Sequence, residues 1–157
     1  MVARGRREVR SLFARAVAIL ARREHSRAEL AAKLRRGLSE EDDPAEVDAV
    51  LDRLEADKLL SDERYAGVLA RTRGARFGDA RIRFDLKSSG VKAETAERAL
   101  DALKGTELER ARSVWSRRFG SLPQSAEERG KQGRFLQARG FSSETIRKVL
   151  QGVPGED

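Results

Sequence analysis

The sequence contains no cysteine, and this absence excludes disulfide bonds, a thiolate nucleophile and a zinc site built on cysteine. Aromatic residues make up only 5% of the 157 residues, and there are three prolines. No apolar run is long enough to cross a bilayer, and the basic first ten residues are not followed by the apolar segment of a secretory signal. We therefore expect a soluble protein of the reducing cytoplasm, without a membrane partner.

Residues that could carry catalysis or hold a metal are also scarce. His25 is the only histidine and lies beside a predicted helix start, so we interpret it as a capping or packing residue. The acidic run 40–43 is typical of a solvated turn and helix start. No glycine-rich phosphate loop ends in Lys-Ser or Lys-Thr, which argues against an ATPase. The sequence therefore predicts no enzyme, no cofactor and no metal site.

Charge is abundant and unevenly distributed. Lysine and arginine number 33 against 26 acidic residues, a net charge of +7 that favours a polyanion or an acidic protein surface as partner. The segment from Glu40 to Asp57 inverts this sign, with nine acidic residues and Arg53 as the one basic residue. Basic residues again outnumber acidic residues in the segments 71–92, 110–118 and 129–148. A simple nucleic-acid coat would not need the acidic segment.

The stretch 61–91 predicts two helices separated by a break between Gly74 and Gly78. Each helix carries one apolar stripe at three- and four-residue steps. The two stripes comprise Tyr65, Val68, Leu69 and Thr72, and then Ile82, Leu86 and Ser89. Ser61 can cap the first helix, and Gly90 can end the second in a left-handed conformation.

Three further helices are predicted before this stretch. The first covers 11–23, and the second starts at Ser26, where Glu29 completes a capping box. We expect Glu29 and Lys33 to form an i,i+4 pair, and Gly37 to end the second helix. The third is predicted to start at Asp43, the residue before a proline suited to the first helical position.

The same plan recurs with a period of about fifty residues. Gly90-Val91 and the helix after it match Gly140-Phe141 and its following helix, position for position. Thr106 with Glu109, and Ser125 with Glu128, predict capped helices in the last repeat. The pattern therefore predicts an all-α fold of about nine helices in three tandem three-helix repeats, forming an elongated curved body. The predicted parts are a basic arm 1–10, repeats 11–60, 61–104 and 105–152, and a tail 153–157.

Four motifs in order carry a family resemblance. They are Arg23-Glu24-His25-Ser26, then Ser61-Asp62-Glu63-Arg64-Tyr65-Ala66, then Gly78 with Arg81-Ile82, and finally Arg134-Phe135-Leu136 with Arg139-Gly140-Phe141-Ser142. Over residues 14–150 the sequence resembles the RecX family. The resemblance implies three tandem three-helix repeats and a non-enzymatic protein that binds the RecA recombinase filament on DNA. It also implies inhibition of RecA's ATP hydrolysis, strand exchange and co-protease activity, and so control of recombination, DNA repair and the SOS response.

Phe84 stands at a position that is commonly polar in this family. On a helical wheel it lies almost opposite Ile82, away from the core stripe. We expect it to be buried against an adjacent repeat, and the alternative is an exposed contact with a partner. Trp115 and Tyr65 fall on apolar stripes, so we expect core packing for both rather than base stacking.

The arginines are the candidates for partner contacts, because they outnumber lysines 26 to 7 and guanidinium groups suit both phosphates and carboxylates. Clustering selects a central group, and the two ends add a second group. The candidates for binding RecA or DNA are Arg71, Arg73, Arg81, Arg83 and Lys87 in the centre, and Arg22, Arg23, Lys33, Arg36, Arg134 and Arg139 at the ends.

Three hypotheses follow. In the first, a monomer lies along the groove of a recombinase filament, with the acidic segment 40–57 toward basic protein and the basic repeats toward acidic protein or DNA. In the second, helix-turn-helix-like units bind DNA directly, and binding weakens steeply with salt. In the third, the chain is a helical adaptor for another acidic partner. The first hypothesis includes single- and double-stranded DNA as partners that bind more weakly without RecA.

Overall fold

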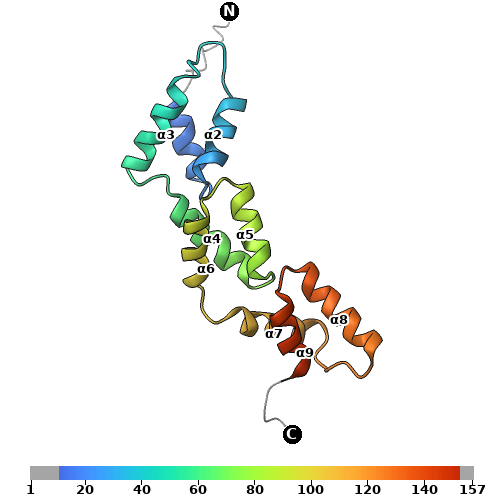
Figure 1. Ribbon diagram of the computed structural model, residues 1–157. Helices are drawn as coiled ribbons and strands as arrows, with labels where there is room; N and C mark the ends of the chain where they lie inside the picture. The colour runs from blue at the N-terminus through green and yellow to red at the C-terminus, as the bar shows by residue number, and fades with distance from the viewer. Residues whose placement is uncertain (1–10, 153–157) are drawn as a thin grey trace, which may run out of the picture. The chain divides into compact units, whose positions relative to one another are not determined.

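The computed structural model describes residues 11–152, so the arm 1–10 and the tail 153–157 predicted at the two ends lie outside the described residues. Within this range the chain forms nine α-helices and no strand, which confirms the all-α prediction (Figure 1). The helices are α1 (Leu12–Leu20), α2 (Arg27–Arg36), α3 (Glu46–Ala56), α4 (Asp62–Gly74), α5 (Asp79–Ser88), α6 (Ala93–Asp101), α7 (Glu107–Arg118), α8 (Ala126–Ala138) and α9 (Ser143–Gln151).

The chain divides between Asp62 and Glu63 into two compact units, which we call unit 1 and unit 2. In unit 1, the helices α1, α2 and α3 pack on one another around leucine side chains. Leu30, Leu51 and Leu54 are fully buried there. Burial of each such side chain stabilises the fold by about 1.5–3 kcal/mol.

The start of α2 is fixed from two sides. Ser26 Oγ accepts the amide of Glu29 at 3.1 Å, as the sequence predicts. The carboxylate of Asp62 accepts the amide of Arg27 at 2.7 Å. Two of the amides that have no partner within the helix are thereby satisfied.

The third helix begins later than predicted. α3 starts at Glu46 and not at the Asp43-Pro44 pair. Asp43 Oδ1 accepts the amide of Ala45 at 2.9 Å, and its carbonyl accepts the amide of Glu46. Asp43 therefore closes a turn ahead of the helix, and the predicted start is two residues too early.

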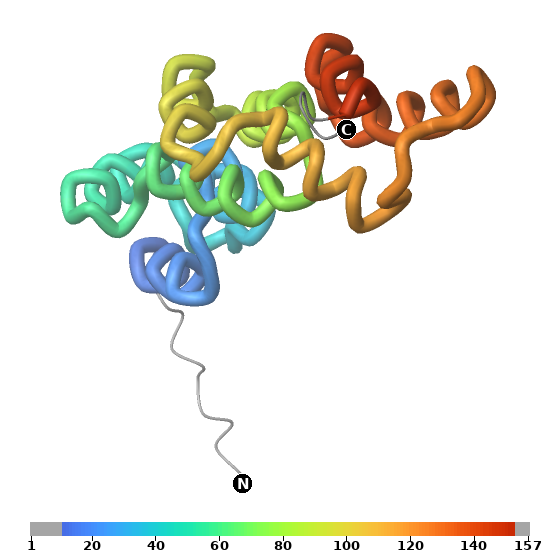
Figure 2. The backbone as a smooth tube through the Cα atoms, turned by 90° about the horizontal axis from the view of Figure 1, so that it is seen from below, coloured from blue at the N-terminus to red at the C-terminus, as the bar shows by residue number. Residues whose placement is uncertain are grey.

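Unit 2 contains two successive hydrophobic clusters. The first joins α4, α5 and α6 and includes the buried side chains of Tyr65, Ile82 and Leu86. The second joins α7, α8 and α9 and includes Leu136 and Val149. In both views α9 lies against α7 (Figures 1 and 2).

The buried face of α4 differs from its predicted stripe. Tyr65, Ala66 and Ala70 are buried, whereas Val68 is 39% exposed. Thr72 is exposed and donates its hydroxyl to the Val68 carbonyl at 2.9 Å. The prediction favoured the larger apolar side chains, whereas two of the buried residues of α4 are alanines.

Phe84 is not buried, so its predicted burial is wrong. The residues on either side of it in the apolar pattern of α5, Ile82 and Leu86, have no exposed surface, whereas 65% of Phe84 is exposed. Because these two residues face the core, a residue between them lies on the far side of the helix.

Two glycines give the last two repeats the same turn. Gly90 and Gly140 have left-handed φ values of 78° and 85°. The residues that follow them, Val91 and Phe141, are buried and donate their amides to the carbonyl five residues earlier, at 3.0 and 3.2 Å. This equivalence supports the predicted internal repeat, since only glycine adopts this conformation without strain.

Candidate nucleic-acid and partner interface

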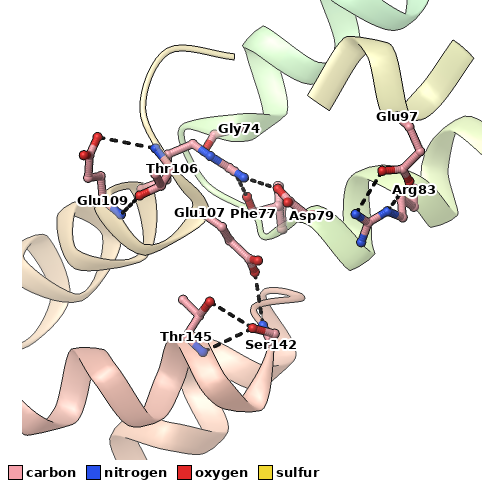
Figure 3. A network of polar contacts seen from close by, with 11 residues as sticks. Gly74, Phe77, Asp79, Arg83, Glu97, Thr106, Glu107, Glu109, Ser142 and Thr145 are labelled. Atoms are coloured by element: carbon pink, nitrogen blue, oxygen red, sulfur yellow. Dashed lines mark hydrogen bonds and ion pairs between the residues drawn. The ribbon is translucent and has the colours of Figure 1, made fainter. Parts of the chain in front are cut away.

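Three of the predicted central cations, Arg73 of α4 and Arg81 and Arg83 of α5, are paired with carboxylates of the same unit. Arg73 and Arg81 each lie 3.2 Å from an oxygen of Asp85. Arg83 contacts both carboxylate oxygens of Glu97, at 2.5 and 3.2 Å (Figure 3). Hydrogen bonding to Arg83 lowers the pKa of Glu97 from its ordinary value. These side chains are partly exposed, so each pair stabilises the fold by no more than about 1 kcal/mol.

Three of the four predicted cations of unit 1, Arg22, Arg23 and Lys33, lie around a buried histidine. His25 is 1% exposed, and burial lowers its pKa from the ordinary value. Its Nδ1 lies 3.0 Å from the Arg23 carbonyl and its Nε2 lies 2.7 Å from Lys33 Nζ, so a neutral ring donates to the first and accepts from the second. Arg23 pairs with Glu29 at 2.6 Å. The predicted Glu29–Lys33 pair is therefore wrong, because both side chains have other partners. Together with Arg22, these cations line a pocket of about 590 Å³.

Much of the acidic segment 40–57 is compensated within unit 1. Arg15 pairs with Asp42 at 2.6 Å and, by hydrogen bonding, lowers the pKa of this carboxyl to about 2. Arg27 contacts both Asp52 and Glu55 at 2.8 Å. These carboxylates therefore neutralise basic side chains of α1 and α2.

The remaining predicted cations have no ion pair among residues 11–152. They are Arg22, Arg36, Arg71, Lys87, Arg134 and Arg139. Arg71 and Arg139 lie in unit 2 beside a surface that carries further basic residues.

That surface is a groove of about 990 Å³ formed by the end of α4, the segment after α6, and α7. None of the residues within 11–152 that line it is acidic, and its other lining residues are alanine, glycine, leucine and serine. Its basic lining residues are Arg71, Lys104, Arg110, Arg112 and Arg117.

A second groove of about 280 Å³ shares Arg117 with the first and again has no acidic lining residue. Its other lining residues are Arg76, Val114, Arg118, Phe135 and Arg139. The Arg139 guanidinium carbon lies 5.1 Å from the centre of the Phe135 ring and 5.4 Å from that of Phe77. Arg118 lies 5.7 Å from the Phe135 ring centre. We call the two grooves together the basic groove.

Arg110 joins the walls of the basic groove. Its Nη1 donates to the carbonyls of Gly74 at 3.1 Å and Phe77 at 2.8 Å, and its Nη2 pairs with Asp79. Figure 3 shows Gly74, Phe77 and Asp79 lying around this guanidinium. The side chain is 12% exposed, so an α7 residue is anchored to the α4–α5 connection in a largely buried site.

A close backbone contact reinforces this junction. The amide of Gly78 donates to the Arg139 carbonyl at 2.8 Å. A Cβ atom on Gly78 would lie 2.3 Å from the carbonyl oxygen of Gly140, and one on Gly140 would lie 2.5 Å from Arg81 Cβ. Both positions therefore require glycine, and the second and third repeats interlock within unit 2.

Helix starts in the third repeat follow the predicted caps. Thr106 and Glu109 form the full capping box (Figure 3). Ser125 Oγ accepts the amide of Glu128. The carboxylate of Glu107, at the start of α7, also accepts the amide of Ser142 at 3.1 Å, as Figure 3 shows. The N-terminal ends of α7 and α9 are thus fixed to each other.

Sequence reasoning did not single out most residues of the basic groove. The sequence indicates an excess of basic residues in 110–118. Which of these residues lie near the end of α4 depends on how the two repeats pack. The residues missed are Arg76, Lys104, Arg110, Arg112, Arg117 and Arg118.

The described part of the chain lacks two other kinds of site. Residues 11–152 contain no group of three or more histidine or acidic side chains placed to hold a metal ion. None of the helices in this range combines the length and hydropathy needed to cross a bilayer.

Two family models match the chain. Residues 61–100 match the model described as RecX, second three-helix domain, and residues 106–150 match RecX, third three-helix domain.

Individual proteins and solved structures that resemble this chain also carry the name RecX. A protein of Leptothrix cholodnii named Regulatory protein RecX is 53% identical over 90% of this chain and 88% of its own length. The protein of that name from Ralstonia nicotianae is 42% identical over 94% and 91% of the two chains. The crystal structure of RecX from Lactobacillus salivarius has the same fold, with a TM-score of 0.74 and 22% identity, covering 89% of this chain and 92% of that one.

Proposed function

Because this chain belongs to the RecX family, we propose that it is a non-enzymatic regulator that binds the RecA filament on DNA and inhibits RecA. The inhibited activities are ATP hydrolysis, strand exchange and the co-protease function, so the protein modulates recombination, DNA repair and the SOS response. The single observation that carries this proposal is the 53% identity over nearly all of both chains to a protein named Regulatory protein RecX.

The proposed mechanism is binding without bond-making chemistry. Cations of unit 2 that have no ion pair among residues 11–152, such as Arg71, Lys87 and Arg134, are available to phosphate or to acidic protein. A protein bound across neighbouring filament subunits would oppose the movements that ATP turnover requires. We also propose a monomer of three repeats, 11–60, 61–104 and 105–152, acting in the cytoplasm.

The test is RecA ATP hydrolysis on single-stranded DNA with increasing amounts of the full-length protein. The expected result is a progressive loss of hydrolysis. A basic protein of similar size and net charge serves as the control, because it reports simple screening of DNA phosphates. Unchanged hydrolysis at an excess of the protein, or equal loss with the control, would refute the proposal.

Direct DNA binding is the second candidate, and the absence of acidic residues from the basic groove favours it. Binding to DNA without RecA should weaken steeply with salt. Reversing Arg71, Arg112 and Arg117 of the groove to glutamate should then abolish it. If DNA binding is weak and RecA alone restores it, the first proposal is favoured over this one.

A further inference from the structure

We infer that the basic groove holds a single nucleic-acid strand by its phosphates and that Arg110 is the positioning residue that sets its two walls. This inference rests on the proposed function and deepens it, because it names the part of the filament that unit 2 contacts and the surface that makes the contact.

The charge of the groove favours nucleic acid as its ligand. Eight basic residues and no acidic residue line its two parts. A nucleic-acid strand carries one charge about every 3.4 Å, whereas an acidic peptide carries neutral residues between its carboxylates. Guanidinium groups also match phosphate oxygens with two parallel hydrogen bonds. Nothing in the lining selects a particular base, so the expected contacts are with the backbone.

The shape of the groove favours one strand over a duplex. Base recognition in the major groove of a duplex requires a helix or ribbon that projects into it. Here the cations lie on the walls of a recess of about 990 Å³, to which α4 and α7 contribute different sides. A recessed basic channel is the usual arrangement of proteins that follow a single strand.

Several cations of the groove are already held in place. Arg117 Nη2 donates to the Ala75 carbonyl at 2.7 Å. Arg118 and Arg139 lie against the Phe135 ring. Side chains fixed in this way lose less conformational freedom when a ligand binds.

Arg110 matters because the cations of the groove come from two repeats. Arg71 belongs to α4, whereas Arg112 belongs to α7. Arg110 anchors α7 to the segment that follows α4 through two carbonyls and the carboxylate of Asp79. Loosening this anchor should separate the two sets of cations without removing any of them.

The first experiment measures binding of the full-length protein to a labelled oligothymidylate of about 15 nucleotides, within the range of single-strand sites. Arg71→Ala with Arg112→Ala should lower the slope of log K against log salt by about 1.4, since each lost phosphate contact contributes about 0.7. The control pair Arg129→Ala with Arg147→Ala makes the same charge change outside the groove and should leave the slope unchanged.

Three results would overturn the groove assignment. They are an equal effect of the control pair, equally tight binding of a duplex of the same sequence, and stronger competition by polyglutamate than by unlabelled strand. The last result would identify an acidic protein segment as the ligand.

The second experiment tests Arg110 as a positioning residue. Asp79→Asn weakens the anchor of Arg110 and raises the net charge of the protein by one. If net charge alone determined strand binding, this variant would bind the strand more tightly. We expect weaker binding and a smaller salt slope instead, with helicity retained. If that variant fails to fold, Arg110→Lys keeps the charge but cannot reach all three acceptors, and it should show the same loss. Unchanged or tighter binding by a folded variant would overturn this role.

These outcomes are distinguishable from failure of the proposed function. Strand binding is measured without RecA, so a protein that does not inhibit RecA can still bind the oligonucleotide through the basic groove. Conversely, inhibition that survives in a variant with no strand binding would leave the proposed function standing and remove the groove from it.

Discussion

Replacing Gly78 with alanine perturbs the junction between the second and third repeats at one atom. The new Cβ would lie 2.3 Å from the carbonyl oxygen of Gly140 and 2.5 Å from the amide nitrogen of Phe141. Both atoms belong to the backbone, so they cannot move aside as a flexible side chain would. The hydrogen bond from Gly78 to the Arg139 carbonyl would be lost as the repeats separate. Overpacking costs about 1–3 kcal/mol and the hydrogen bond about 1 kcal/mol, so we expect unit 2 to lose about 2–4 kcal/mol.

Urea unfolding followed by tryptophan fluorescence measures this loss. Trp115 is the only tryptophan, and its indole N–H donates to Gln132 at 2.8 Å, so its fluorescence reports the third repeat in unit 2. Gly133→Ala is the matched control. Its Cβ would meet Ile146 at an ordinary 3.8 Å, and alanine inside a helix should stabilise by about 0.5–1 kcal/mol. An unchanged midpoint for Gly78→Ala, or equal destabilisation by both variants, would refute the reasoning.

Three further predictions concern single side chains. Because His25 is neutral and buried with a lowered pKa, the unfolded state binds a proton at this histidine more readily than the folded state does. The free energy of unfolding of unit 1, measured by urea unfolding at several pH values, should therefore fall as the pH drops below about 6.5. In His25→Gln the contribution of this site to that fall should be absent. The Asp42 carboxyl should titrate with a pKa of about 2 in carbon NMR spectra, and Arg15→Ala should move that pKa upward toward 3.8; an unmoved value would contradict the ion pair. Thr106→Ala removes the cap of α7 and should cost about 1 kcal/mol by tryptophan fluorescence, whereas Thr106→Ser should retain most of that stability.

Local signals in the sequence located most of the helices. Leucines at three- and four-residue steps predicted buried positions such as Leu30 and Leu86, and these are fully buried. The caps at Ser26, Thr106 and Ser125 are also present. Such features depend on residues within one or two turns of each other, so periodicity and residue type suffice to find them.

Features that depend on packing between helices were harder to predict. The core face of α4 includes Ala66 and Ala70, whose burial depends on the surrounding helices and not on their own hydrophobicity. The ion pair between Arg83 and Glu97 joins two successive helices, so it too depends on their packing. The importance of Arg110 depends on the approach of α7 to the α4–α5 connection, which no local pattern encodes.

The division of charge along the chain has a kinetic consequence. Residues 11–62 contain nine basic and twelve acidic residues, a net charge of −3, whereas residues 63–152 contain 20 basic and 11 acidic residues, a net charge of +9. A polyanion therefore attracts unit 2 at long range and repels unit 1. Diffusional encounters should begin through unit 2, at a rate that falls as added salt shortens the reach of the field.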